Sequence, residues 1–236
     1  MKAVLKRSPG TNFASWDACV AHSGIWLANS SIGRRRRIAA GVLIYAQGSR
    51  HPFFYLIRQG FVQTAMTHET GRRLALELMG PGSIFGEGAA FDGSERFVDA
   101  WATTDCELTV YAPDDIRNAG TSGALLFESL IKIMGAKQRI LAAKLLQFSN
   151  EDPQARMRAL LARLVSVQRR SDPSGGARIN QIWISQEQLG EMCGMSRVSA
   201  ARALRRLADG GLVSTHPKYV EVLDAALLEA ELYRQP

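Results

Sequence analysis

The arginines of residues 185–207 have the type and the spacing to form hydrogen bonds with the edges of DNA bases. In this segment, SQEQLGEMCGMSRVSAARALRRL, the arginines share a predicted helix with several small residues. A guanidinium can donate two parallel hydrogen bonds to guanine O6 and N7, and each such pair discriminates against other bases by about 1–3 kcal/mol. Small side chains would let the helix enter the major groove without clashes. We therefore expect the DNA contacts to come from this segment and from a hairpin after it: Ser185, Ser196, Arg197, Val198, Ser199, Ala200, Arg202, Arg206 and Lys218.

Two short helices joined by a glycine turn are expected to position these arginines. Ser185 and Gln188 have the spacing of a capping box, which gives the first helix a defined start. Gly194 can end that helix, and Ser196 can cap the second one. The second helix is expected to have one set of residues on or near one face (Val198, Ala201, Leu204 or Arg205, and Leu207 or Ala208) and a second set largely on the other (Arg197, Ser199, Ala200, Arg202 and Arg206).

A β-hairpin is expected directly after these helices. Residues 212–215 and 219–222 flank His216-Pro217-Lys218, and residues 179–184 could pair with this hairpin. The order of parts is typical of a winged helix-turn-helix, in which Lys218 at the wing tip would contact a phosphate. The alternative is an amphipathic surface helix with solvated arginines. The capping box, the turn glycine, the second cap and the hairpin together favour the DNA-reading unit.

The positive charge of the chain is concentrated in the same region. The 236 residues carry a formal net charge of +7, and residues 153–218 hold 11 Arg and Lys against 4 Asp and Glu. Such a localised excess is the electrostatic footprint expected for a polyanionic partner. We therefore expect this partner to be double-stranded DNA.

Neither a metal centre nor a common catalytic constellation is indicated. Cys19, Cys106 and Cys193 are far apart, with no CxxC or Cys/His pair at ligand spacing. No Ser-His-Asp order, carboxylate pair or phosphate loop stands out, so we do not expect an enzyme. No apolar run reaches the roughly 18 residues of a membrane span, and no signal peptide is evident. We expect a protein of the reducing cytoplasm, without membrane association.

Residues 34–112 have the pattern of short antiparallel strands. Regular short strands punctuated by Gly and Pro are typical of a sandwich or barrel. Apolar side chains occupy both alternating sets of residues 53–58, which predicts burial on both faces, and the arginine run 34–37 is expected on a solvated sheet edge. The candidate strands are residues 36–39, 42–45, 53–58, 60–67, 73–78, 83–85, 96–102 and 107–111.

A long helix is predicted from Thr121 to Asn150, because apolar residues recur there at three- and four-residue steps. Its length of about 40 Å exceeds what one small sandwich can cover, so we expect the helix to pair with a second copy of itself. The alternative is that it packs along its own barrel. The residues expected in the dimer contact are Leu126, Leu130, Ile133, Lys137, Ile140, Leu141 and Phe148.

The segment Asn150-Glu151-Asp152-Pro153 is expected to end the long helix and begin the next one. Asp152 is a good N-cap, and Pro153 then falls at the first helical position, where proline is tolerated. These boundaries predict a sensor domain over residues 1–120, a dimerisation helix and hinge over 121–152, and a DNA-binding domain over 153–236.

From about residue 27 to residue 222 the sequence resembles the cyclic-AMP receptor protein/FNR (Crp/Fnr) family of bacterial regulators. The resemblance is carried by AAGVLIYAQGS, by GPGSIFGEGAAFDGSERFVDAWATTDCEL, and by ISQEQLGEMCGMSRVSAARALRRLADGGLV. It implies an α+β fold with an N-terminal antiparallel β-roll of jelly-roll type, a long dimerisation helix and a C-terminal winged helix-turn-helix. It also implies a homodimer on a palindromic operator, with RNA polymerase as a further partner and a small-molecule effector.

The resemblance places the effector pocket at Gly86, Glu87, Arg96, Phe97, Leu141 and Ala142. Cyclic-nucleotide binders of the family carry an Arg-Ser or Arg-Thr pair that holds the cyclic phosphate, whereas this chain has Arg96-Phe97, with the spacing one residue shorter. Family members that grip adenine use polar residues where this chain has Leu141-Ala142. These differences argue against cyclic AMP and favour an apolar effector or none.

Val198 is a further departure from the family pattern, in the DNA-reading helix. Members often have a Glu at this position, which accepts a hydrogen bond from cytosine, so a different half-site is expected.

Two cofactors known among relatives are not expected here. Iron–sulfur members of the family have an N-terminal cysteine cluster, but only Cys19 precedes residue 100 in this chain. Haem-binding relatives exist, and His22, His51 and His68 are conceivable ligands, although turn and surface positions explain them better. An alternative function is a cyclic-nucleotide sensor subunit that controls another protein, which would need no basic winged helix.

Overall fold

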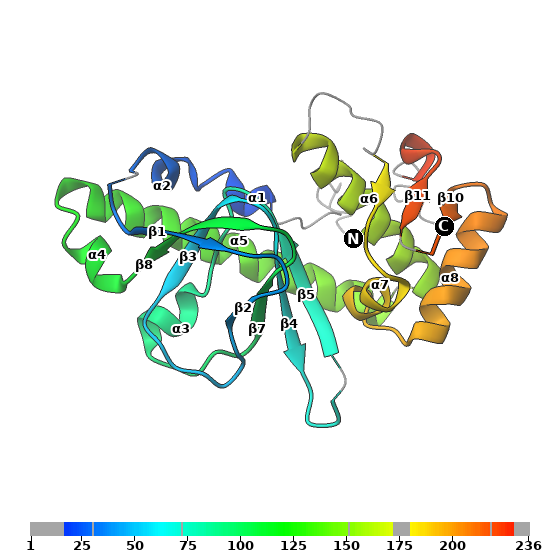
Figure 1. Cartoon of the computed structure of the whole chain (residues 1–236), viewed down its shortest axis with the longest axis horizontal. Coiled ribbons are helices and arrows are strands. Elements are labelled where there is room, and N and C mark those ends of the chain that lie inside the picture. The colour runs from blue at the N-terminus through cyan, green and yellow to red at the C-terminus, as the bar shows by residue number, and fades with distance from the viewer. Residues whose placement is uncertain are drawn as a thin grey trace, which may run out of the picture.

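The computed structural model describes residues 17–29, 31–71, 73–150, 152–171, 180–217 and 219–228. A β-roll occupies one part of the molecule, a helical unit with a small sheet occupies the other, and the long helix α5 (Thr121–Asn150) runs along the roll toward that unit (Figure 1). The α+β order of elements agrees with the predicted fold class. Within the described residues, no helix is long and apolar enough to cross a bilayer.

The β-roll consists of two antiparallel four-stranded sheets. One sheet has the order β1-β8-β3-β6 and the other the order β2-β7-β4-β5. Side chains from both sheets share one hydrophobic core, which includes Tyr55, Val62 and Leu108. The strands are β1 (Arg34–Ile38), β2 (Leu43–Tyr45), β3 (Phe54–Gln59), β4 (Val62–Thr67), β5 (Arg73–Met79), β6 (Ile84–Phe85), β7 (Asp99–Ala102) and β8 (Cys106–Tyr111).

All eight predicted strands are present within a few residues of their expected bounds. Strand β3 is buried on both faces, as expected: Tyr55 and Ile57 face the interior of the roll, and Phe54 and Leu56 face the surrounding helices. Strand β7 begins three residues later than predicted, since Arg96 instead forms backbone hydrogen bonds with the turn residues Gly48 and Ser49. The arginines of β1 lie on an exposed sheet edge, as expected.

Helices cover the outer face of the β1-β8-β3-β6 sheet. Short helices α1 (Asp17–Val20), α2 (Gly24–Ala28), α3 (Glu87–Asp92) and α4 (Pro113–Arg117) join α5 on this side, and the sequence patterns did not predict them. Trp26 of α2 is buried, and its Nε1 donates a hydrogen bond to Ser129 Oγ of α5 at 2.9 Å. This packing fixes the long helix to its own roll.

The C-terminal unit has the predicted order of a winged helix. Helix α6 (Pro153–Ser171) begins after Asp152, whose carboxylate accepts hydrogen bonds from the amides of Gln154 and Ala155. A three-stranded sheet of order β10-β11-β9 packs with the helices around one core. The remaining elements are β9 (Gln181–Ile182), α7 (Gln186–Met192), α8 (Arg197–Asp209), β10 (Val213–Thr215) and β11 (Val220–Val222).

Candidate nucleic-acid interface and effector pocket

Helices α7 and α8 begin at the serines that the sequence pattern singled out. Ser185 Oγ accepts a hydrogen bond from the Gln188 amide at 3.2 Å, and Gln188 Oε1 accepts one from the Ser185 amide at 3.0 Å. Ser196 Oγ accepts a hydrogen bond from the Ser199 amide at 3.2 Å. The capping box and the second cap are therefore confirmed.

The turn between these helices depends on glycine. Gly194 has a φ of +63°, a backbone conformation that disfavours other residues. A Cβ at Gly190 would lie 3.2 Å from the Cβ of Ala200, so the two helices cross at close range there. The tight turn and the close crossing together set the angle at which α8 leaves α7.

One face of α8 is exposed and carries all four arginines of this helix. Arg202 lies on this face between Val198 and Arg205, while the opposite face packs into the core of the winged helix. Nothing in the described part of the chain covers the exposed face, so a duplex can approach it. The exposed residues of α8 are Arg197, Val198, Ala201, Arg202, Arg205, Arg206 and Asp209, and the buried ones are Ala200, Ala203, Leu204 and Leu207.

Two expectations about this helix were wrong. Ala200 is fully buried against Gly190, so it cannot contact DNA. Val198 and Ala201 are exposed on the same side as Arg202, not on the face of Leu204 and Leu207. Small side chains fit either face of a helix, so the sequence left the helix phase ambiguous. With the phase fixed, Arg205 joins the exposed set, a position that the pattern had left open between core and surface.

The wing is present as an antiparallel hairpin. Val213, Ser214 and Thr215 pair with Val222, Glu221 and Val220, and β11 also pairs with β9. Lys218, the predicted phosphate contact, lies outside the described residues.

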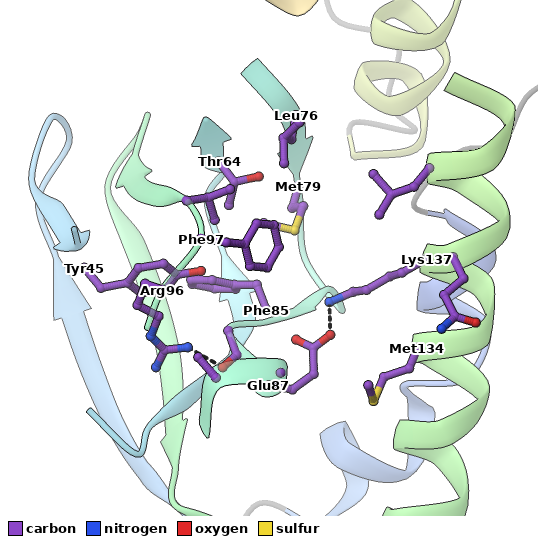
Figure 2. A pocket seen from close by; sticks show the side chains of 16 residues that line it. Tyr45, Thr64, Leu76, Met79, Phe85, Glu87, Arg96, Phe97, Met134 and Lys137 are labelled. Carbon is purple, nitrogen blue, oxygen red and sulfur yellow. Dashed lines mark hydrogen bonds and ion pairs between the residues drawn. The ribbon is translucent and has the colours of Figure 1, made fainter. Parts of the chain in front are cut away.

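A cavity of about 220 Å³ lies between the roll and α5 (Figure 2). Gly86, Glu87, Arg96, Phe97 and Leu141 line it, as expected, but Ala142 does not and is exposed instead. Helix α5 turns by about 100° per residue, so the positions that face the cavity lie three or four residues apart. From this helix, Met134, Lys137, Gln138 and Leu141 contribute to the wall.

Arg96 is buried at the base of this cavity and is held by the protein itself. Its guanidinium donates hydrogen bonds to the carbonyl oxygens of Gly86, His51 and Phe53, and its Nη2 lies 3.1 Å from His51 Nδ1. It also stacks over the ring of Tyr45 at 4.5 Å. Its Nε has no hydrogen-bond partner among the described residues.

The buried Arg96 guanidinium limits the space at Gly86 and affects the pKa of the neighbouring His51. A Cβ on Gly86, whose φ is +80°, would lie 2.9 Å from Arg96 Nη1. Burial lowers the pKa of His51, and the nearby Arg96 charge lowers it further. Burial also raises the pKa of Tyr45 far above its usual value. Both side chains are therefore neutral at neutral pH, and His51 can accept a hydrogen bond from Arg96.

Glu87 forms an ion pair across the cavity with Lys137 of α5. The Lys137 Nζ lies 2.5 Å from Glu87 Oε1 and also donates to the Ile84 carbonyl oxygen at 2.8 Å. Both side chains are largely buried. Lys137 was expected in a dimer contact, but its side chain points toward the roll of the same chain. The pair joins the segment after β6 to the long helix.

The predicted dimer residues of α5 mostly pack within one copy. Leu126, Leu130, Ile133 and Ile140 are buried against the roll, and Phe148 is half-buried, near Gly194 and Arg156. The helix has two apolar stripes, and the sequence did not reveal which of them the roll covers. The other stripe is exposed and contains Ile131, Met134, Leu141 and Leu145.

The cysteines give no sign of a reactive or metal-binding site. All three are buried and unpaired with one another, and burial raises the pKa of Cys19 to about 11 and that of Cys193 to about 12. They are therefore thiols at neutral pH rather than the thiolates that bind metals. Within the described ranges, no group of His, Cys, Asp and Glu could hold a metal ion.

Comparison with known families assigns both parts of the chain. Residues 35–120 match the family model of the cyclic nucleotide-binding domain, and residues 155–231 match that of the Crp-like helix-turn-helix domain. The first match contains most of the cavity around Arg96, and the second contains α7 and α8.

Among curated proteins, this chain is 31% identical to the cyclic AMP receptor protein of Thermus thermophilus over 196 residues, covering 83% of this chain and 87% of the relative. It is 28% identical to the cAMP-activated global transcriptional regulator Vfr of Pseudomonas aeruginosa over 194 residues, covering 80% and 88%.

The fold is also that of solved regulators. A c-di-GMP-responsive global regulator of Xanthomonas campestris superposes with a TM-score of 0.69 at 22% identity, covering 86% of this chain and 99% of that one. A CRP/FNR-family transcriptional regulator of Thermus thermophilus gives the same TM-score and identity, with 86% and 100% covered. This chain belongs to the Crp/Fnr family of transcription regulators, with a cyclic nucleotide-binding domain and a helix-turn-helix domain.

Proposed function

We propose that this regulator acts as a homodimer, in which two copies of α8 read the half-sites of a palindromic operator and an uncharged effector in the roll governs binding. The exposed arginine face of α8 carries this proposal. The members of the family are regulators rather than enzymes, and an exposed recognition helix has no use in a cyclic-nucleotide sensor subunit that controls another protein.

The base-reading part rests on position and charge. Val198, Arg202 and Arg205 lie along the centre of the exposed face of α8, where they can reach base edges in the major groove. Arg197 and Arg206 flank them, in positions suited to phosphates. Val198 offers a methyl surface to thymine rather than an acceptor to cytosine. RNA polymerase is the natural further partner of a regulator bound next to a promoter.

Selection from random duplexes tests this part. We expect enrichment of a two-fold symmetric sequence with half-site centres about 34–36 Å apart, one helical turn. Affinity for it should fall steeply as salt rises, because phosphate contacts release counterions. Failure to enrich any sequence, or binding insensitive to salt, would contradict the assignment.

The dimer part rests on the exposed stripe of α5. Ile131, Met134, Gln138, Leu141 and Leu145 follow one another at alternating three- and four-residue steps, the spacing of a coiled-coil seam. Ile131 and Leu145 are each 69% exposed in the single chain, which is unusual for large apolar residues unless a partner covers them. A second copy of α5 is the partner that this symmetric spacing fits.

The effector part rests on how the charges of the cavity are used. The guanidinium of Arg96 is already bonded to three carbonyl oxygens, and Glu87 is neutralised by Lys137. A cyclic phosphate would have to displace these contacts, and Phe97 offers it no hydroxyl. Removing an anion from water without new donors is costly. These features favour an uncharged effector against the apolar wall.

Cyclic AMP is the second candidate, because the Thermus and Pseudomonas relatives are described as cyclic-AMP proteins and Arg96 Nε has no partner among the described residues. Calorimetry with cyclic AMP and cyclic GMP separates the two. We expect no saturable heat of binding, even at nucleotide concentrations well above those that would fill a specific site. Tight binding of either nucleotide would overturn the uncharged-effector proposal and leave the DNA proposal standing.

A further inference from the structure

A second cavity, of about 320 Å³, lies between the roll and the winged helix and shares no lining residue with the cavity around Arg96. The roll contributes the start of β4, the end of β5 and the loop after β7. The winged helix contributes α6, β9 and α7. Strand β5 and helix α7 are in direct contact beside it (Figure 1). Its volume is in the range of sites for small organic ligands.

The lining of this interdomain cavity is uncharged. Its apolar side chains include Phe61 and Leu78 from the roll and Leu164 and Trp183 from the winged helix. The polar side-chain groups among the described lining residues are the indole N–H of Trp183 and the amides and hydroxyls of Gln63, Thr103, Thr104, Gln181 and Gln188. A charged ligand would lose its hydration here and find no counter-ion, so the lining selects an uncharged molecule.

Gln63 is the feature that points to a ligand rather than to simple packing. Val62 belongs to the interior of the roll and Thr64 lines the cavity around Arg96, so Gln63 between them projects to the other side of β4. The residue as a whole is 8% exposed, and no hydrogen bond of its amide is present within the part of the chain that the structure describes. The amide keeps some accessible surface at this cavity, so a ligand there can offer it a hydrogen-bond partner.

The walls on both sides are held in place. In the roll, Phe61 N donates to Thr104 Oγ1 at 2.9 Å, and the Phe61 carbonyl oxygen accepts from Thr103 N at 2.8 Å. In the winged helix, the Trp183 ring stacks on Tyr219 with centroids 4.8 Å apart, and Tyr219 stacks on His216 at 4.2 Å. A ligand would therefore meet a formed site.

We propose that this interdomain cavity is a binding site for a small uncharged molecule with an apolar, preferably aromatic, body and a group that hydrogen-bonds to the Gln63 amide. Such a ligand contacts two domains at once. Its binding therefore favours the domain orientation described here over any other orientation.

The test uses N-phenyl-1-naphthylamine, an uncharged aromatic amine that fluoresces in apolar sites, and its sulfonated analogue 8-anilinonaphthalene-1-sulfonate. We expect saturable binding of the uncharged probe, with affinity at least tenfold higher than for the sulfonate. In full-length protein labelled with 5-fluorotryptophan, the Trp183 fluorine resonance, assigned with Trp183→Phe, should shift during the titration, while that of the buried Trp26 should not.

Two filling variants identify the site. Thr103→Trp adds a large side chain to the interdomain cavity from an exposed position. It should lower the affinity for the uncharged probe by roughly tenfold or more. Ala89→Trp fills the cavity around Arg96 and should leave this binding intact. A signal that survives Thr103→Trp but not Ala89→Trp would overturn the proposal. So would equal binding of the sulfonate, or an unshifted Trp183 resonance in the wild-type protein, which does not depend on any variant folding.

Discussion

Arg202 has the position on α8 that is most informative about DNA reading. It lies on the uncovered face, four residues after Val198 and three before Arg205, so these three side chains are neighbours along one line of the helix. A guanidinium in this place can pair with two acceptors of one guanine, which lysine cannot do with the same geometry. Its contribution should therefore be to sequence preference as well as to affinity.

We expect Arg202→Ala to weaken binding to the selected operator by about 1–3 kcal/mol and to relax preference at one base pair in each half-site. Fluorescence anisotropy with the operator and its single-base variants measures both effects. Arg117→Ala removes an exposed arginine from α4, at the opposite end of the molecule from α8, and serves as the control (Figure 1). If Arg202→Ala kept the wild-type affinity and preference, α8 would not be the reading helix.

His51 should give the stability of the roll a pH dependence. Burial and Arg96 lower its pKa below the ordinary value of 6.5, so the unfolded chain takes up a proton before the folded one as the pH falls. The stabilisation is therefore complete above about pH 6.5 and is lost progressively below it. In His51→Gln, the free energy of unfolding should fall less between pH 6.5 and about pH 5, measured by urea titration. Equal slopes in the two proteins would contradict this account.

At the scale of elements, helix α5 carries two different apolar stripes. One stripe packs against the roll through Leu126, Leu130 and Ile133. The other is exposed and has the heptad spacing of a seam through Ile131 and Leu145. Leu146 follows directly in the chain and is 61% exposed, but it lies off this seam. The pair Leu145 and Leu146 therefore separates the effect of the seam from that of surface hydrophobicity.

We expect Leu145→Glu to weaken the dimer by about 3–6 kcal/mol, since each of two copies loses the burial of one leucine, about 1.5–3 kcal/mol. Leu146→Glu should change self-association much less. Sedimentation velocity over a range of concentrations measures the equilibrium. Two variants that dissociate equally, or a wild-type protein that is monomeric, would exclude the proposed seam.

Local signals explain what the sequence predicts well. The caps at Ser185 and Ser196 depend on residues three positions apart, and the turn at Gly194 depends on one backbone angle, so these features could be located from the chain alone. The strands of the roll were likewise marked by their alternation and turns. Helices α1 to α4 escaped prediction because they have only four to six residues, too few to establish a period.

The wrong predictions concern features that are determined by tertiary contacts and not by the local sequence. Whether Ala200 or Val198 faces inward depends on where α7 crosses α8, and which stripe of α5 is buried depends on the roll. The same holds for the pocket, where the wall contains Gln138 and Lys137 rather than Ala142. The bonding of Arg96 to three carbonyl oxygens depends on chain segments that come together only in the fold.

At the scale of the whole molecule, a buried charge cluster connects the two halves. Glu77 of β5 lies 2.8 Å from Lys144 of α5 and 3.3 Å from Arg163 of α6. Lys144 also donates to the Leu76 carbonyl oxygen. Burial lowers the pKa of Lys144, although the Glu77 charge opposes this change. The cluster thus ties a strand of the roll, the long helix and the winged helix to one carboxylate.

We expect Glu77→Gln to destabilise the protein by about 3–5 kcal/mol, because it leaves two buried cations without their anion. Part of this loss should be seen as separate unfolding of the two halves in urea. The unfolding transitions followed by tryptophan fluorescence and by circular dichroism should then no longer coincide. The matched control is Glu107→Gln, which breaks the more exposed pair with Arg35 and should cost no more than about 1 kcal/mol. A loss as small for Glu77 as for Glu107 would show that the cluster does not hold the halves together.

The stripe of α5 that contains Met134, Gln138 and Leu141 is at once a wall of the cavity around Arg96 and the centre of the proposed seam. Under the proposed dimer, a substitution at any of these positions changes ligand preference and self-association together. During evolution, substitutions at this wall could therefore not change ligand preference independently of self-association. Each step would have to preserve subunit pairing, so changes of ligand preference should accumulate first on the far wall, around Tyr45, Thr64 and Phe97.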